Sequence, residues 1–241
     1  MKKTLLLLVA ALSLTLSACD DGDNGNKENE SEELKSLGNG FYSAKGHRFV
    51  DLALPSGLLW AETNIGATAA ADAGNYFAWG ETSSRSSYAW ADYKYGNGTA
   101  ALTKYTADDG ITTLDMQDDA ARVMWGKACR MPSKAEITEL LDEANCTWTW
   151  TGKTDSNANF AYGYVVKSTR NGNEIFIPAA GYYNGSTLFS LNTDGGVWSS
   201  TLSASGFDSA YTLSFLNGHY ETDTNLRHLG VPVRAVAELS E

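Results

Sequence analysis

CRMPSKAEITELLDEA, residues 129–144, contains the clearest secondary-structure signal in the chain. Ser133 is a favourable N-cap residue, and Glu136 stands three positions later, which is the spacing of a capping box. The apolar residues that follow recur at helical spacing and would form one stripe: Ala135, Ile137, Leu140, Leu141 and Ala144. The pattern predicts a short helix over residues 134–144 that packs one face against a core.

A second, shorter helix is indicated just before this segment, in DDAARVMWG at residues 118–126. Asp118 and Asp119 stand at its start, where the helix dipole favours negative charge. The same two residues, together with Asp115, could alternatively bind calcium. The segment lacks the dense Asp, Asn and Gly periodicity of an EF-hand loop, however, so a helix start is favoured.

Short strands surround the two helices in the sequence. Residues 47–60 alternate in polarity before a Pro55-Ser56-Gly57 turn and continue into a second apolar run, which predicts a hairpin. Residues 164–178 predict another hairpin around the turn Asn171-Gly172. Further short strands are expected over residues 146–152, 195–201, 209–218 and 230–236. The pattern predicts an α+β fold in one domain, residues 40–236, with two short helices, mostly antiparallel short strands and long loops.

The N-terminal segment predicts export and a lipid anchor. Residues 1–18 contain two lysines followed by an apolar run that is too short for a membrane-spanning helix and is typical of a signal peptide. Leu16-Ser17-Ala18-Cys19 resembles a bacterial lipobox, which implies cleavage before Cys19 and lipidation of that residue. The alternative is an ordinary secretion signal that ends near a cysteine.

The segment behind this cysteine predicts a tether. Residues 19–39 are rich in Asp and Glu and contain no aromatic residue, so they are expected to form a flexible, acidic linker. The Asp20-Asp21 pair resembles the surface-export signal of Bacteroidetes lipoproteins, which implies a lipid-anchored protein on the cell-surface side of the outer membrane. The alternative is a plain spacer on the periplasmic side. Residues 237–241 are expected to be a short tail.

Charge and cysteine content limit the partners and cofactors. The formal net charge of the 241 residues is −11, so the chain should repel a phosphate backbone, and no nucleic-acid partner is expected. Cys129 and Cys146 flank the predicted helix, which is roughly 16 Å long, and this separation argues against a disulfide. The sequence contains no CxxC or HxxxH spacing for zinc and no glycine-rich phosphate loop, so neither a metal nor another cofactor is predicted.

Five motifs in a fixed order resemble a known family. Residues 129–136 resemble the helix start of the formylglycine-generating-enzyme-like branch of the C-type lectin fold. The other four motifs are Phe77-Ala78-Trp79-Gly80, FIPAAGY at residues 176–182, Trp198-Ser199-Ser200, and GVPVR at residues 230–234. Together they look like the Fibrobacter succinogenes major paralogous domain of Bacteroidetes lipoproteins, over about residues 47–236. The resemblance implies a C-type-lectin-like fold with a core that includes Trp79, Trp125, Trp198, Leu213 and Phe215.

The resemblance does not extend to the activities of these families. Calcium-dependent lectins carry a Trp-Asn-Asp triplet, whereas two serines follow Trp198 here, so calcium-dependent sugar binding is not expected. Formylglycine-generating enzymes use cysteines near the C-terminus, and no cysteine follows Cys146. The three histidines, His47, His219 and His228, belong to no recognisable nucleophile motif. The sequence therefore predicts a protein that is not an enzyme.

The C-terminal segment is the expected binding region. Some relatives on this fold are variable proteins of diversity-generating retroelements, in which asparagine codons mutate only at adenines and cannot become Lys, Gln, Glu, Met or Trp. Between Thr201 and Gly230 the only such residue is Glu221. In the strand expected at residues 209–218, one face should be core-like and the other should face outward with Thr212, Ser214 and Leu216. Residues 219–229 are expected to form a surface loop.

We therefore expect a ligand to bind loops 201–209 and 216–229 without a metal. The candidate contact residues are Ser203, Ser205, Phe207, Asp208, Thr212, Ser214, Leu216, Asn217, His219, Tyr220, Asn225, Leu226 and His228. The function predicted first is a non-catalytic, adhesin-like recognition lipoprotein with a protein or glycan ligand. The alternatives are a structural or accessory subunit of a surface assembly, such as a pilus tip, and, third, an enzyme of unknown class.

Overall fold

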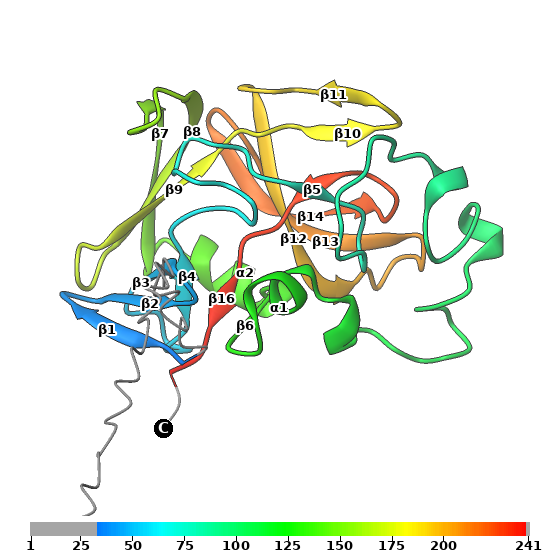
Figure 1. Ribbon diagram of the computed structural model, residues 1–241, viewed down its shortest axis with the longest axis horizontal. Helices are drawn as coiled ribbons and strands as arrows, with labels where there is room; N and C mark the ends of the chain where they lie inside the picture. The colour runs from blue at the N-terminus through cyan, green and yellow to red at the C-terminus, as the bar shows by residue number, and fades with distance from the viewer. Residues whose placement is uncertain (1–32, 240–241) are drawn as a thin grey trace, which may run out of the picture.

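The computed structural model describes residues 33–239, in which most regular structure is antiparallel β-sheet (Figure 1). The largest sheet has the strand order β1-β2-β3-β4-β16-β6. The bounds are Lys35–Gly38 (β1), Phe41–Ala44 (β2), His47–Asp51 (β3), Leu59–Ala61 (β4), Val236–Ala237 (β16) and Cys129–Arg130 (β6). The hairpin predicted between β3 and β4 is confirmed. Strand β16 pairs with both β4 and β6, so the two ends of the described chain meet in one sheet.

Two three-stranded antiparallel sheets and two short ribbons complete the described strands. The first sheet consists of β7 (Cys146–Thr154), β8 (Phe160–Ser168) and β9 (Glu174–Pro178), and β8 with β9 is the other predicted hairpin. The second consists of β12 (Asp194–Leu202), β13 (Ser209–Leu216) and β14 (His219–Leu226). The ribbons pair β10 (Tyr182–Asn184) with β11 (Thr187–Phe189), and β5 (Tyr76–Phe77) with β15 (Val231–Pro232). In Figure 1, β10 and β11 lie at the top and β1 lies at the bottom left.

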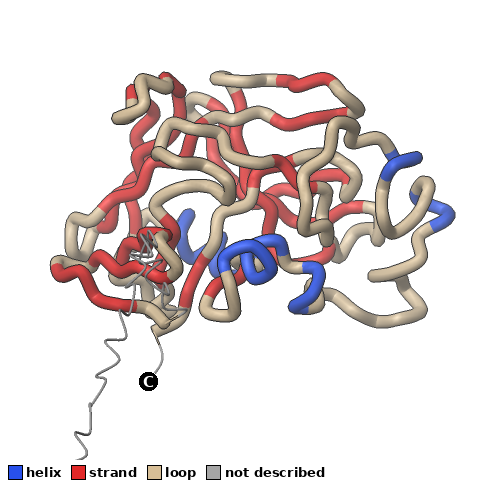
Figure 2. Tube along the Cα trace, in the orientation of Figure 1, coloured by secondary structure: helices blue, strands red, loops and turns tan. Residues whose placement is uncertain are grey.

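The first of the two predicted helices is confirmed as α1 (Ala120–Trp125). Asp119 is its N-cap residue, and its carboxylate accepts a hydrogen bond from the backbone N–H of Arg122. Three 3-10 turns precede it: η1 (Trp90–Asp92), η2 (Thr99–Ala101) and η3 (Met116–Asp118). They belong to a long connection, residues 78–119, that contains no named strand. Figure 2 shows this connection as the loop-rich end of the molecule.

The second predicted helix is confirmed as α2 (Lys134–Leu141), with the complete capping box between Ser133 and Glu136. It ends at Leu141 rather than at Ala144, because the chain turns at Asp142 towards β7. The carbonyl of Asp142 accepts a hydrogen bond from the backbone N–H of Cys146, the first residue of that strand. Helix α2 packs against β12, β13 and β14, and so supports the second three-stranded sheet.

The buried core contains all five residues that the sequence placed there. They are Trp79, Trp125 and Trp198 in one apolar cluster, and Leu213 and Phe215 in a second. Alternate residues of β4 belong to the two clusters, since Leu59 and Ala61 lie in the first and Trp60 lies in the second. Because side chains of a strand alternate between faces, the six-stranded sheet separates the two clusters.

Three segments differ from the sequence prediction. Lys35–Gly38 were expected in the tether but form the edge strand β1. All four residues are exposed, and backbone pairing with β2 gives the strand its order. Ala237, expected in the tail, is buried in β16. The loop predicted over residues 219–229 is wrong up to Leu226, because these residues form β14. The broad prediction of an α+β fold with mostly antiparallel strands is confirmed.

The signal peptide, the lipid anchor and the two remaining cysteines were also subjects of sequence predictions. Residues 1–18 and Cys19 lie outside the described residues. Within residues 33–239 no helix is both long enough and apolar enough to cross a membrane. Cys129 and Cys146 are buried free thiols, in agreement with the expectation that they do not pair. Burial raises the pKa of each thiol to about 11, which keeps both in the unreactive protonated form.

Candidate functional site

A groove of about 220 Å³ opens on the β12-β13-β14 sheet and is bordered by Tyr182 of β10 and Val231 of β15. On β14 it is lined by every second residue: His219, Glu221, Asp223 and Asn225. The other two strands contribute Ser214, Phe215 and Leu216 of β13 and Asp194, Gly195 and Gly196 of β12, and Gly181 lies next to Tyr182 at the border. Because successive side chains of a strand point to opposite faces, these alternating residues place the groove on one face of the sheet.

Strand register explains why these residues meet. Two rows of paired positions cross the sheet: Gly196-Ser214-Glu221 and Asp194-Leu216-His219. Side chains at paired positions lie on the same face, close enough to interact. Leu213 and Phe215 belong to the opposite face and are buried in the second apolar cluster. The predicted alternation is therefore confirmed for Leu213 and Phe215 against Ser214 and Leu216, but it is wrong for Thr212, which is fully buried.

Hydrogen bonds hold the polar side chains of the groove. Oγ1 of Thr212 lies 2.9 Å from Oγ of Ser214 and accepts a bond of 3.1 Å from Nδ2 of Asn225. Nε2 of His219 lies 2.9 Å from Oε1 of Glu221. The groove therefore presents hydroxyl, amide, carboxylate and imidazole groups in an ordered array, which suits a ligand with many hydrogen-bonding groups.

The groove is acidic. Asp194, Glu221 and Asp223 contribute three carboxylates, and no Lys or Arg belongs to the lining. Such a lining repels anionic ligands and favours cations or the hydroxyl groups of a neutral ligand. In the part of the chain that the structure describes, no group of three or more His, Cys, Asp and Glu side chains is arranged to hold a metal ion.

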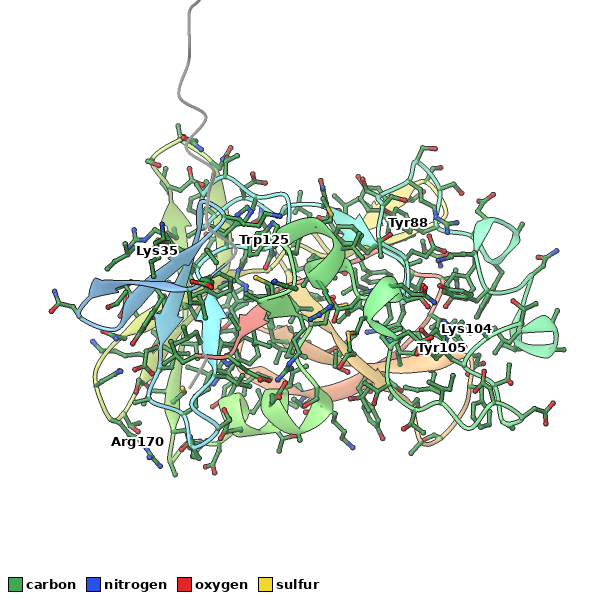
Figure 3. All side chains as sticks on the ribbon, turned by 60° about the horizontal axis from the view of Figure 1, so that its bottom comes forward. Lys35, Tyr88, Lys104, Tyr105, Trp125 and Arg170 are labelled. Atoms are coloured by element: carbon green, nitrogen blue, oxygen red, sulfur yellow. The ribbon has the colours of Figure 1, made fainter. Side chains whose placement is uncertain are left out.

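The aspartates considered for calcium are hydrogen-bonded within the protein. Asp118 accepts bonds from Nζ of Lys94 and Lys104 and from the hydroxyl of Tyr105, and the last two lie together at the loop-rich end (Figure 3). Burial would raise the pKa of Asp118, but hydrogen bonds from Lys104, Tyr105, Tyr95 and Lys94 lower it to about 2. Together these contacts hold residues 78–119, so they give Asp118 a structural role.

A larger hollow, of about 860 Å³, lies between α1, β6 and the C-terminal end of the described chain. Arg130 crosses it and donates hydrogen bonds to the carboxylates of Glu136 and Glu238. The guanidinium of Arg122 donates to the carbonyl of Lys127. The ion pairs of Arg130 join Glu136 of α2 to Glu238 near the end of the described chain.

The predicted contact residues divide into two groups. Four of them line the groove: Ser214, Leu216, His219 and Asn225. Thr212 bonds to groove residues but is fully buried, and Tyr220 belongs to the opposite face, where it stacks on Trp148 at 4.8 Å. Asn217 lines an adjoining hollow.

The remaining predicted contacts need correction. Ser203 and His228 are buried, with exposures of 6% and 5%, so they are not accessible to a ligand. The others do not line the groove: Ser205, Phe207 and Asp208 lie between β12 and β13, and Leu226 ends β14. Phe207 and Leu226 are exposed, so they lie outside the groove but remain at the surface. The sequence did not indicate that Ser203 is buried, because serine residues in turns are usually exposed.

Nine groove residues were not predicted: Gly181, Tyr182, Asp194, Gly195, Gly196, Phe215, Glu221, Asp223 and Val231. The sequence ETDTN at residues 221–225 does alternate with the period of a strand, but its polar residues give no apolar face to reveal it. At Gly196 a Cβ would lie 2.6 Å from the carbonyl oxygen of Leu213, so this position requires glycine. That requirement arises from the pairing of β12 with β13, which local sequence does not show.

The chain matches no family model, no curated protein and no solved structure. The chemistry of the groove therefore follows from its own lining. The hydroxyl of Ser214 bonds to Thr212, and His219 bonds to Glu221, so the groove does not contain a serine activated by a histidine.

Proposed function

We propose that this protein is a non-catalytic, surface-anchored recognition protein that binds its ligand in the groove of the β12-β13-β14 sheet. The observation that carries this proposal is the alternation along β14, which places four polar side chains on one open face: His219, Glu221, Asp223 and Asn225. The opposite face of the sheet packs on the core. A binding surface on a rigid sheet holds its polar groups in fixed positions, which favours selective binding.

The fold proposed for the domain is C-type-lectin-like, and contacts between the resembling motifs support it. The indole N–H of Trp79 donates to the carbonyl of Ser199, and that of Trp198 donates to the carbonyl of Phe77, each at 2.8 Å. Val231 pairs with Phe77 in the β5-β15 ribbon. Three of the motifs that are ordered along the sequence are therefore also in contact in space.

The proposed location is the cell-surface side of the outer membrane, through a lipid on Cys19. This part of the proposal rests on the sequence of residues 1–39.

The retroelement hypothesis concerns the same face. Asn225 lines the groove and Asn217 lies beside it, and asparagine codons are the usual targets of such diversification. A near-copy of the codons for residues 197–236, differing at adenines and next to a reverse-transcriptase gene, would support it. Without that copy, the retroelement hypothesis would be removed, and a structural subunit would rank equally with a recognition protein.

The experiment that tests the proposed function compares two tryptophan variants of the full chain. Ser214→Trp fills the groove, whereas Thr187→Trp adds the same side chain at an exposed position of β11. Both variants and the unaltered chain are screened against an array of oligosaccharides and extracellular glycoproteins. We expect a ligand that the unaltered chain and Thr187→Trp bind equally, and that Ser214→Trp binds at least about tenfold more weakly. Equal affinity in both variants would contradict binding in the groove.

A structural role in a surface assembly is the second candidate, and strand β1 favours it. Within the described residues β1 pairs only with β2, and all four of its residues are exposed. An open edge of this kind can accept a strand from another chain. A stable partner that co-purifies with the unaltered chain but not with Ser36→Pro would support this role.

A further inference from the structure

A second hollow adjoins the groove and has a different lining. Its volume is about 520 Å³, and it contains two aromatic residues, Trp150 of β7 and Tyr162 of β8. The polar residues around them are Asn192, Thr193 and Asn217. Asp194 and Leu216 line both hollows, so the second hollow and the groove share a border.

The two aromatic rings have the same orientation. Trp150 and Tyr162 are parallel within 1°, and their centroids lie 6.3 Å apart. Trp150 packs against the second apolar cluster and contacts Tyr164 at 5.2 Å, which fixes its plane. Tyr162 is 44% exposed, on a hairpin that reaches the top of Figure 1. The pair therefore holds two parallel aromatic rings at the border of the hollow, and the Tyr162 ring is open to solvent.

Two neighbouring residues maintain this arrangement. A Cβ at Gly152 would lie 2.8 Å from Cζ of Phe160 and 3.4 Å from Cε1 of Tyr162, so the glycine leaves the space that these rings occupy. The backbone N–H of Tyr162 donates a bond of 3.0 Å to Oδ1 of Asn192. This bond holds the Asn192 amide beside the ring, at the polar edge of the hollow.

The combination of flat aromatic faces and a polar edge fits a sugar. A pyranose ring has C–H groups on its faces, which pack on an electron-rich aromatic face, and hydroxyl groups around its rim. Carboxylate and amide groups such as those of Asp194 and Asn217 bind adjacent hydroxyls. A purely apolar ligand would bury the Asp194 carboxylate without a partner, which is costly. Neither hollow is lined by Lys or Arg, so a phosphorylated or sulfated ligand would lack a counter-charge.

We propose that Trp150 and Tyr162 form the stacking platform of a carbohydrate-binding site that continues past Asp194 into the groove. The proposal rests on the proposed function, and it narrows the ligand to an uncharged oligosaccharide. The sugar rings stack on the platform, and their hydroxyls bond to Asp194 and the nearby amides. The carboxylates of Asp194, Glu221 and Asp223 exclude chains that contain uronic or sialic acids.

The test is calorimetric titration of the full chain, kept in detergent, with defined hexasaccharides. The neutral probes are the β-1,4-linked hexamers of glucose, xylose and mannose and the α-1,4-linked hexamer of glucose, and the acidic probe is hexagalacturonate. At least one neutral hexamer is expected to bind saturably and to change the tryptophan fluorescence. Hexagalacturonate is expected to bind at least about tenfold more weakly, or not at all. Equal affinity for hexagalacturonate would overturn the proposal.

Variants of Trp150 and Tyr162 test whether the sugar binds on the platform. Trp150→Ala and Tyr162→Ala are each expected to weaken binding by about tenfold, which corresponds to about 1.4 kcal/mol. Tyr162→Phe keeps the ring and should stay within about twofold of the unaltered chain. Tyr211→Ala, which removes a ring that packs on Lys134 away from both hollows, is the matched control. If Trp150→Ala does not fold, the two Tyr162 variants decide the outcome.

Two results would overturn the platform. The first is the absence of saturable binding by every neutral hexamer, and the second is unchanged affinity in folded Tyr162→Ala. Both are distinguishable from failure of the proposed function. A ligand of any class that Ser214→Trp loses and Tyr162→Ala retains would leave the groove as the binding site and remove the platform.

Discussion

In residues 78–119 the backbone runs without a named strand, whereas residues 194–226 form three paired strands. The first region depends on buried side chains for its order. Arg227 is fully buried, and its guanidinium donates hydrogen bonds to the carbonyls of Lys104 and Tyr105 and to the hydroxyl of Tyr93. In the second region, backbone groups satisfy one another, since β13 pairs with β14 along the whole of Ser209–Leu216.

This difference determines which positions can change. A backbone carbonyl buried away from water needs a donor, so a side chain that supplies several donors, such as Arg227, is constrained. In the β13-β14 pair, backbone N–H groups donate to backbone carbonyls, and this pairing does not depend on which side chains are present. Exposed residues of β14 on the groove face, such as Glu221 and Asp223, can therefore vary at little cost in stability, while the loop-rich end keeps its shape. A recognition protein needs both properties.

The largest expected effect comes from removing the buried guanidinium. Arg227→Met should lower the free energy of unfolding by at least about 3 kcal/mol, because several buried acceptors lose their donor at once. Urea-induced unfolding measures this loss, and a chain that does not fold would also agree with it. The matched control is Arg48→Met, since Arg48 pairs with Glu62 at the surface, and about 1 kcal/mol or less should be lost there. A loss below about 1 kcal/mol for Arg227→Met would mean that other contacts order the loop-rich end.

The next effect is a dependence of stability on pH. Hydrogen bonds lower the pKa of Asp118 from 3.8 to about 2, against the opposing effect of burial. A carboxyl group with a lowered pKa in the folded state contributes stability above its unfolded pKa, and this contribution is lost as the pH falls from about 4 towards 2. Between about pH 6 and pH 2.5 the unaltered chain should therefore lose about 1–2 kcal/mol more than Asp118→Asn.

Urea unfolding at each pH provides the measurement. Asp108→Asn is the control, because Asp108 is exposed in the same connection, and this variant should follow the unaltered chain. Parallel pH curves for Asp118→Asn and the unaltered chain would contradict a structural role for Asp118. Arg227 would then be the one buried side chain left to explain the order of the loop-rich end.

A smaller effect is expected at α2, which supports the grooved sheet from behind. Ser133→Ala removes the side-chain acceptor of the capping box and should cost about 1 kcal/mol in the free energy of unfolding. Ser205→Ala, a change of the same kind in an exposed loop, should cost less than about 0.5 kcal/mol. Equal losses in the two variants would show that the cap does not limit the stability of α2.

Local signals in the sequence predicted much of the fold. The capping box of Ser133 and Glu136 and the turn at Asn171-Gly172 each depend on a few neighbouring residues, and both are present in the structure. The five core residues were expected from the family resemblance, and all five are buried. The capping box and the turn require no knowledge of how distant segments pair.

The groove and the buried arginine depend on distant pairing, and so they were missed. The groove face of strand β14 is exposed and polar, so the composition of β14 does not indicate a strand. Residues 219–226 form a strand because they pair with β13. Asp194 joins the site only because β12 pairs with β13 in one register. Arg227 is a type of residue that is normally exposed, and only the packing of residues 93–105 around it gives it acceptors.

The smallest effect on stability is expected on the groove face, and it compares the two regions with the same chemical change. Glu221→Gln converts a carboxylate to an amide, as Asp118→Asn does, but Glu221 is exposed and bonds only to exposed His219 among the described contacts. Its free energy of unfolding should change by less than about 0.5 kcal/mol at pH 7, whereas Asp118→Asn should lose about 1–2 kcal/mol. The affinity for a groove ligand should respond in the opposite order, with Glu221→Gln altered and Asp118→Asn unchanged. If the two variants had equal effects on stability, the groove face would be as constrained as the loop-rich end, and a variable binding surface there would be ruled out.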